Sequence, residues 1–167
     1  IGGRWRPPGS TGPEPFTYYE TIGGGEGAYP FRDGQDGVHV HMTNTANTPV
    51  EALESGYPLM VLEYSLRSGS GGAGLRRGGS GIRKALLFAG IGGEASLLAT
   101  RRQQGPGGLA GGSPARPGED HLVRWGRVER LRGMSAVELM TGDILIMDTP
   151  GGGGWGCGKE ECPSEQK

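Results

Sequence analysis

The sequence predicts a mainly β domain: many short strands with Gly-rich turns, arranged as a sandwich or as irregular sheets, and one short helix. Glycine supplies 36 of the 167 residues, roughly three times its usual share in proteins. It gathers in clusters with no three-residue period, which excludes collagen. Between the clusters lie short runs of Val, Ile, Leu, Tyr and Thr, which is the pattern of strands joined by tight turns.

The first part of the chain carries two predicted strands. Residues 1–15 contain several prolines that hold the backbone extended, and they predict a linker or surface segment. Strand-forming side chains dominate residues 16–22, and a Gly triplet ends that run. After a loop, the alternating residues 36–45 predict the next strand.

The helix is predicted near residues 49–55. Thr48 is suited to cap it, Pro49 fits its first position, and Glu51 completes a capping box. Gly56 is expected to end the helix in the left-handed conformation that glycine tolerates.

The rest of the chain predicts further strands, two of them in a hairpin around Gly126. The β domain is expected to span residues 16–156, and a polar, mobile tail is expected at residues 157–167. The strands are predicted at residues 61–67, 82–88, 95–100, 121–125, 128–131, 136–140 and 144–148.

Charge and composition narrow the class of protein. The net charge is −1, from 17 basic and 18 acidic residues, so nothing indicates binding to nucleic acid or to a membrane. No apolar run approaches the roughly 20 residues that span a bilayer. Two cysteines are too few for a disulfide framework, and a cytoplasmic location is expected. The apolar share of 34% is low, so either the domain is rich in loops or a partner supplies part of its core.

The stretch of residues 36–45 holds two of the three histidines. In a strand, His39, His41 and Thr43 would form one row, because positions two apart point to the same face. Imidazole is a common metal ligand, but a full metal site needs further ligands. The alternative is a pair of hydrogen-bonded histidines in a polar channel or at a subunit contact. The nearest acidic candidates for a metal are Glu20, Asp33 and Asp36.

The Gly clusters do not match a phosphate-binding loop. Such a loop needs Gly-Lys-Ser/Thr at the start of a helix, and no helix-forming sequence follows residues 69–74 or 151–154. No Gly-x-Ser-x-Gly elbow stands between a strand and a helix either. The clusters are therefore expected to be tight turns and close approaches of backbone.

Several different short motifs follow one another over roughly residues 16–156. Each motif alone is weak evidence for any family. The ordered set is specific, and it resembles the C-terminal part of the hydantoinase B / 5-oxoprolinase family. The motifs are YYETIGGG (18–25), DGVHVHMTNT (36–45), NTPVEALE (47–54), RSGSGGAG (67–74), RGGSG (77–81), GLAGG (108–112) and TPGGGGWG (149–156).

The resemblance implies a role in an ATP-dependent enzyme that opens a cyclic amide, such as a hydantoin or 5-oxoproline. It implies as partners a hydantoinase A-type ATPase subunit and the N-terminal part of the B-type subunit. ATP with Mg and a divalent metal are implied for the whole assembly, but no cofactor or metal is expected in this chain. The chain would contribute structure and a wall of the substrate site, and it is expected to be inactive alone.

The polar side chains around residues 36–45 are the site candidates. We expect His39 and His41 to be catalytic, as donors to a carbonyl or proton carriers. Substrate binding is expected from Glu20, Asn44 and Thr45. The alternatives are a stand-alone metal-binding β domain, a subunit of a related ATP-dependent carboxylase, and a purely structural interaction module.

Overall fold

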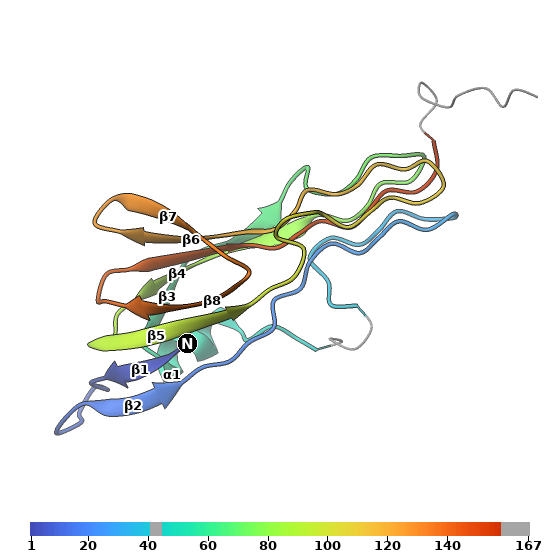
Figure 1. The fold of residues 1–167 in the computed structure, drawn as a ribbon. Coiled ribbons are helices and arrows are strands. Elements are labelled where there is room, and N and C mark those ends of the chain that lie inside the picture. Colours follow the sequence, from blue (N-terminus) through green and yellow to red (C-terminus); the bar gives the residue numbers. More distant parts are fainter. Residues whose placement is uncertain (41–44, 158–167) are drawn as a thin grey trace, which may run out of the picture.

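The structure, a computed structural model, describes residues 1–40 and 45–157, which form two antiparallel sheets and one short helix (Figure 1). This confirms the predicted mainly β class. The four-stranded sheet has the order β2 (Glu14–Thr17), β1 (Gly2–Trp5), β5 (Gly92–Leu98) and β8 (Met134–Leu139). The five-stranded sheet has the order β3 (Leu59–Arg67), β4 (Gly81–Phe88), β9 (Ile144–Asp148), β6 (Glu119–Arg124) and β7 (Arg127–Leu131).

The hydrophobic core lies between the two sheets. Leu86 and Phe88 of β4 enter it from the five-stranded sheet, and Phe16 and Ala95 enter it from the four-stranded sheet. The rings of Phe16 and Phe88 lie 6.3 Å apart, within the range of favourable aromatic contact. The helix α1 (Val50–Gly56) adds Leu53, which is fully buried.

The ends of α1 differ from the predicted capping. Pro49 occupies the N-cap position and no side chain caps the helix. The Thr48 N–H, just before it, donates to Glu20 Oε1. Gly56 is the last helical residue but is not left-handed. The helix ends when Tyr57 turns extended, with its N–H donating to Leu53 O at 3.0 Å.

Most later strands lie where the sequence predicts them, whereas the first third of the chain differs. Residues 1–15, expected to be a linker or surface segment, contain β1, and β2 ends at Thr17 instead of continuing to residue 22. The predicted strand at residues 36–45 does not form within its described part. Val38 makes only an isolated bridge with Gly24, because Gly37 takes a positive φ of 58° that interrupts an extended run.

The hairpin around Gly126 is confirmed. Trp125 and Gly126 both have positive φ angles, 50° and 76°, as a two-residue type I′ turn requires. The residues expected to form a mobile tail lie, from 158 onward, outside the described part of the chain. Within the described part, no helix is long and apolar enough to cross a membrane.

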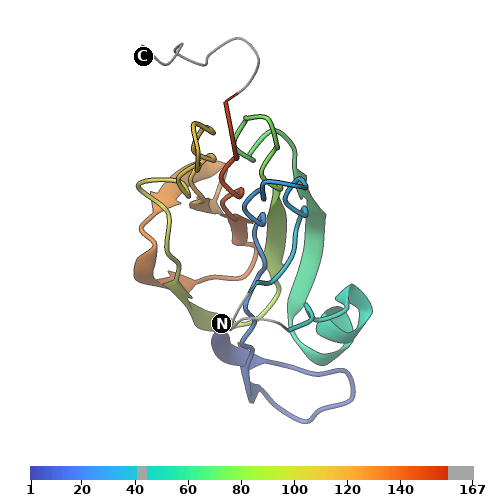
Figure 2. The ribbon, with the colours of Figure 1, turned by 90° about the vertical axis from the view of Figure 1, so that its right-hand side faces the viewer.

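The Gly-rich segments form a bundle of extended backbone beyond the ends of the strands. The segments lie side by side, as seen along their length in Figure 1 and end-on in Figure 2. Backbone hydrogen bonds join them in a chain: Gly72 N–H donates to Gly152 O, Gly152 N–H to Gly79 O, and Gly79 N–H to Glu26 O, each at 2.8 Å. The clusters thus serve mainly close packing of backbone, and tight turns only in part.

The bundle has no room for side chains. A Cβ atom at Gly152 would lie 1.9 Å from Glu26 O, and one at Gly79 would lie 1.8 Å from Gln35 O. Backbone cannot yield to such a clash without breaking the hydrogen bonds that join the segments. Glycine is therefore required here for space rather than for backbone flexibility.

Gly152→Ala should lower the free energy of unfolding by about 3 kcal/mol or more, because overpacking a site enclosed by backbone forces the segments apart. Gly107→Ala is the matched control, since a Cβ there would meet nothing within 4 Å. The measurement is denaturant unfolding of both variants. Equal stabilities for the two would contradict the proposed role of close packing.

Candidate functional site

Polar side chains gather where β3 and β4 meet the residues that follow β2 and precede α1. Tyr64 of β3 and Lys84 of β4 are direct cross-strand partners, so they share one face of the sheet. It is the face of the core, because Leu86, two residues beyond Lys84, belongs to the core cluster. The site thus lies at the end of the sandwich next to the glycine bundle.

Lys84 and Glu20 form a buried ion pair. Lys84 Nζ lies 2.5 Å from Glu20 Oε2, and the exposed fractions of the two side chains are 1% and 6%. The other Glu20 oxygen, Oε1, accepts a hydrogen bond of 2.8 Å from the Thr48 N–H. Lys84 Nζ also lies 5.3 Å from the centre of the Tyr64 ring, which is within cation–π range. Glu20 therefore ties the start of the helical segment to the sheet.

Beside the ion pair, hydrogen bonds join three further polar side chains in a row. His39 Nε2 lies 2.8 Å from Asn47 Oδ1, and the Asn47 amide group donates to the Tyr64 hydroxyl. In this arrangement Nε2 carries the proton of the neutral imidazole, and Nδ1 keeps the basic lone pair. Nδ1 is buried and has no hydrogen-bond partner among the described residues.

The glycine bundle places His39. Val38 N–H donates to Gly24 O and Gly37 N–H donates to Ser80 O, both at 2.8 Å. Gly37 also lies against Leu66, which is 3.0 Å from the position of a Cβ at Gly37. These contacts hold the segment against β3 and β4, so His39 reaches Asn47 without being part of a strand.

A small recess opens next to Tyr64. It has a volume of about 200 Å³ and is lined by Gly37, Tyr64, Ser65, Leu66 and Ile82. Its walls combine the apolar side chains of Leu66 and Ile82 with the polar edge of Tyr64. Its volume is below the roughly 300–1,000 Å³ of most ligand pockets, so it has room for part of a small ring.

The structure brings together only some of the residues that the sequence singles out. Glu20 and His39 both belong to the polar cluster. His41 and Asn44 lie outside the described residues. Thr45 is exposed, and among the described residues its hydroxyl contacts the neighbouring Ala46 O, at 3.5 Å.

Sequence reasoning did not single out Asn47, Tyr64 or Lys84. Lys84 had a usable signal, since it alternates with the apolar Ile82 and Leu86 on one face of β4, and a buried charge needs a partner. Tyr64 and Asn47 had none, because their role depends on contacts between segments that are distant in sequence.

The acidic candidates for metal binding are already engaged. Asp36 accepts hydrogen bonds from Ser80 N–H at 2.5 Å and from Arg77 at 3.0 Å. Asp33 accepts from the Arg77 N–H at 2.9 Å, and Glu20 is paired with Lys84. Among residues 1–40 and 45–157, no three His, Cys, Asp or Glu side chains gather in a way that could hold a metal ion. The described residues therefore do not fit a metal centre.

Tyr18 lies against the same cluster and is buried. Burial raises the pKa of its hydroxyl above the ordinary value, and the nearby Glu20 carboxylate raises that pKa further. Tyr18 therefore stays protonated at neutral pH and acts as a neutral group in the site.

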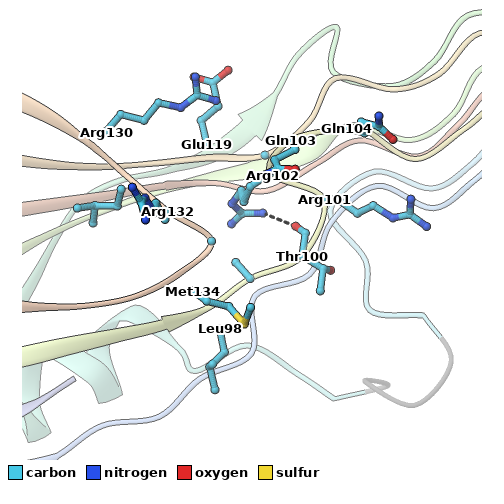
Figure 3. A pocket seen from close by; sticks show the side chains of 14 residues that line it. Leu98, Thr100, Arg101, Arg102, Gln103, Gln104, Glu119, Arg130, Arg132 and Met134 are labelled. Carbon is cyan, nitrogen blue, oxygen red and sulfur yellow. Dashed lines mark hydrogen bonds between the residues drawn. The ribbon is translucent and has the colours of Figure 1, made fainter.

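A larger cleft of about 1200 Å³ lies away from this cluster, near the ends of β5 and β8 (Figure 3). Arg101, Arg102, Arg130 and Arg132 line it, together with Met134 and other residues. Arg102 makes two hydrogen bonds, of 2.6 and 2.9 Å, to the buried Asp120 of β6. None of the residues singled out from the sequence lines this cleft.

The fold and the site can be compared with known proteins. Residues 3–158 match the family described as Hydantoinase B/oxoprolinase. The chain belongs to the hydantoinase B/oxoprolinase family. The ordered motifs that resemble this family are thus confirmed as a sign of membership.

The relatives of this hydantoinase B-family chain are much longer proteins. 5-Oxoprolinase 1 of Arabidopsis thaliana is 42% identical over 87% of this chain, which spans 12% of the plant protein. The crystal structure of the ATP-dependent caprolactamase from Pseudomonas jessenii matches 94% of this chain and 28% of its own, with a TM-score of 0.74 and 27% identity. The nucleotide-free structure of acetone carboxylase matches 80% of this chain and 22% of its own, with a TM-score of 0.60. At 19% identity, this last likeness concerns the fold alone.

Breaking the buried ion pair should destabilise the chain by about 3 kcal/mol for Lys84→Met, because an unpaired buried carboxylate remains. Glu20→Gln should destabilise too, although Gln can still accept from Thr48. The free energy of unfolding should fall less in the double variant than the sum of its decreases in the two single variants, because the double variant buries no charge. The measurement is a double-mutant cycle on the free energy of unfolding. Additive losses would mean that the two charges do not interact as the structure indicates.

Stability should also depend on Asp36 as the pH falls. The Ser80 N–H, and after it Arg77, hold the pKa of Asp36 below its ordinary value of 3.8. The stabilisation from Asp36 is therefore complete above that value and is lost as the pH drops through the lower, folded-state pKa. The melting temperatures of the wild type and Asp36→Asn should differ most near neutral pH and converge in acid. A difference that is constant from about pH 7 to about pH 2 would contradict this.

Proposed function

We propose that this chain is part of an ATP-dependent cyclic-amide hydrolase, in which it contributes structure and one wall of the substrate site. Membership of the hydantoinase B/oxoprolinase family, the 5-oxoprolinase relative and the likeness to the caprolactamase support this role. The chain spans only a small share of those proteins. We therefore assign ring opening to an assembly that also holds the rest of the B-type polypeptide and a hydantoinase A-type ATPase subunit.

The observation that carries the proposal is the polar chain His39–Asn47–Tyr64 beside the recess at Tyr64. A cyclic amide presents an N–H donor and a carbonyl acceptor on an otherwise apolar ring. Leu66 and Ile82 would contact the ring carbons, and the Tyr64 hydroxyl would hydrogen-bond the amide. Ile82 is buried, whereas Leu66 and Tyr64 are about half exposed, so the recess stays open to the water that hydrolysis requires.

In this proposal His39 acts first as a general base and then as a general acid. Hydrolysis of the ring adds water to the carbonyl carbon, breaks the C–N bond and leaves the nitrogen with one more proton. His39, with Nε2–H directed at Asn47, would take the proton of the attacking water at Nδ1 and return it to the leaving nitrogen. His41 is proposed as a second proton carrier, and Asn44 and Thr45 as donors to the substrate.

Glu20 fits a positioning role better than direct contact with substrate. Both of its carboxylate oxygens are occupied, one by Lys84 and one by Thr48. It would hold Lys84 beneath the Tyr64 ring and fix the segment that carries Asn47. Its loss would disturb the geometry of the site rather than remove a group that touches the substrate.

The cofactors and the cellular setting belong to the assembly. The caprolactamase named above is ATP-dependent by its description, and we place ATP, Mg and a divalent metal in parts outside these 167 residues. The described glycine segments bond to each other through their backbone rather than forming a phosphate loop. A cytoplasmic location is proposed from the cysteine content.

The test is ring opening by the intact assembly with hydantoin, 5-oxoproline and caprolactam as substrates. His39→Ala should lower kcat at least about 100-fold, the usual scale for loss of a positioned acid–base group, and His41→Ala should lower it as well. Leu98→Ala is the control, because Leu98 is exposed on β5 of the other sheet. Rates are normalised to the amount of intact assembly.

Unchanged ring opening in both His39→Ala and His41→Ala would refute their catalytic role. Carboxylation that depends on bicarbonate, in place of ring opening, would refute the hydrolase and favour the carboxylase. A tightly bound stoichiometric metal in the isolated chain would favour the stand-alone metal-binding domain.

A further inference from the structure

The outer face of the five-stranded sheet carries an uninterrupted apolar row. Leu87 lies between Leu86 and Phe88, which both enter the core, so its side chain points to the opposite face. The row is followed across the sheet from each residue to its direct partner on the next strand. In the order β3 to β7 the row is Met60, Leu87, Ile144, Val123 and Val128.

The strands in the middle of this sheet are apolar on both faces. In β9, Leu145 and Met147 enter the core, while Ile144 and Ile146 point outward. In β4, Ala85 and Leu87 point outward as well. Strands that are apolar on both faces are typical of a sheet covered on both sides, whereas a sheet with one face in water alternates between apolar and polar residues.

The described helix does not cover this outer face, where Leu87, Ile144 and Val123 are half-buried in the middle of the row. The one described helix, α1, buries Leu53 in the core between the sheets, and so lies on the other side. At the two ends of the row, the exposed fraction is 51% for Met60 and 66% for Val128. A contiguous apolar face of this kind marks a site of association.

A neutral cluster of ion pairs borders the apolar face. Asp148 of β9 makes hydrogen bonds of 2.7 and 2.6 Å to Arg83, and Arg67 lies 3.5 Å from Asp148 and 3.7 Å from Glu119. Two arginines and two acids balance, so this border attracts neither an acidic nor a basic partner. Five strands about 4.8 Å apart make a face about 19 Å wide, which suits a layer of helices or a second sheet.

We propose that the outer face of the five-stranded sheet is the docking surface for the rest of the hydantoinase B-type polypeptide, through an uncharged element with an apolar stripe. This rests on the proposed function, because it assumes that the chain works within a longer B-type subunit. The matched caprolactamase chain supports that occupant: more than two thirds of it lies outside the match. The five-stranded sheet would then be the middle of three layers. Its central strands, which are apolar on both faces, would be buried on both.

The first experiment is photo-crosslinking in the intact assembly, purified through a tag on this chain. A benzophenone amino acid replaces Met60 or Val128, at the two ends of the row. A matched control replaces Leu98, which is 85% exposed on β5 of the other sheet. Cross-linked peptides from Met60 and Val128 should map to the B-type polypeptide outside these 167 residues. Cross-links only to the ATPase subunit, only to a second copy of this chain, or to nothing would each overturn the proposal.

The second experiment adds a charge to the face. With the crosslinker at Met60, Val128→Asp should lower the cross-link yield about tenfold, because the interface would bury an unpaired carboxylate. Leu98→Asp should leave the yield unchanged. Circular dichroism melting confirms that both variants are folded. An equal yield in the two variants would overturn the proposal.

The two proposals can fail separately. Cross-links as expected, with no ring opening by the assembly, would refute the hydrolase and leave the docking surface standing. Ring opening that depends on His39, with no cross-link from Met60 or Val128, would refute the docking surface alone.

Discussion

The arrangement of this domain depends on backbone packed directly against backbone. Where the Gly-rich segments meet, a single added carbon would lie less than 2 Å from a carbonyl oxygen, and the hydrogen bonds between segments satisfy groups that side chains or water satisfy elsewhere. Such a bundle is stiff, because no segment can shift without exposing several unpaired groups. It fixes Gly37 and Val38 against the sheet, and so it fixes the approach of His39 to Asn47.

The polar cluster combines this stiff support with a buried charge. Lys84 lies below the Tyr64 ring and is neutralised by Glu20, whose second oxygen holds the Thr48 backbone. A buried pair of this kind contributes little net stability, since the cost of removing both charges from water offsets their attraction. Separating the partners would leave an uncompensated buried charge, so the pair disfavours arrangements that move the three segments apart. This helps Asn47 and Tyr64 to keep a fixed geometry.

The sequence predicts the fold better than it predicts the site. The strands of the second half are short runs of strand-forming residues bounded by turn signals, and the hairpin at Gly126 follows from local turn chemistry, so both could be located from neighbouring residues alone. The stretch around His39 also alternates, yet strand formation needs a partner along its length, and the bundle offers Val38 only one bridge, to Gly24. The glycine clusters were identifiable as close approaches of backbone, but which segments approach one another is a long-range property. The same holds for Tyr64 and Asn47, whose contact joins residues 17 positions apart.

The low apolar share of the chain follows from the glycine bundle. The bundle holds its segments together through backbone hydrogen bonds rather than through packed side chains. Glycine lowers the apolar percentage there without leaving any apolar surface uncovered. The outer face of the five-stranded sheet is a different matter, because Ile144 and Val123 are apolar where a solvent-facing sheet would carry polar residues. A domain can be poor in apolar residues overall and still place some where water would be its only neighbour. It is that placement, rather than the composition, that indicates a missing layer.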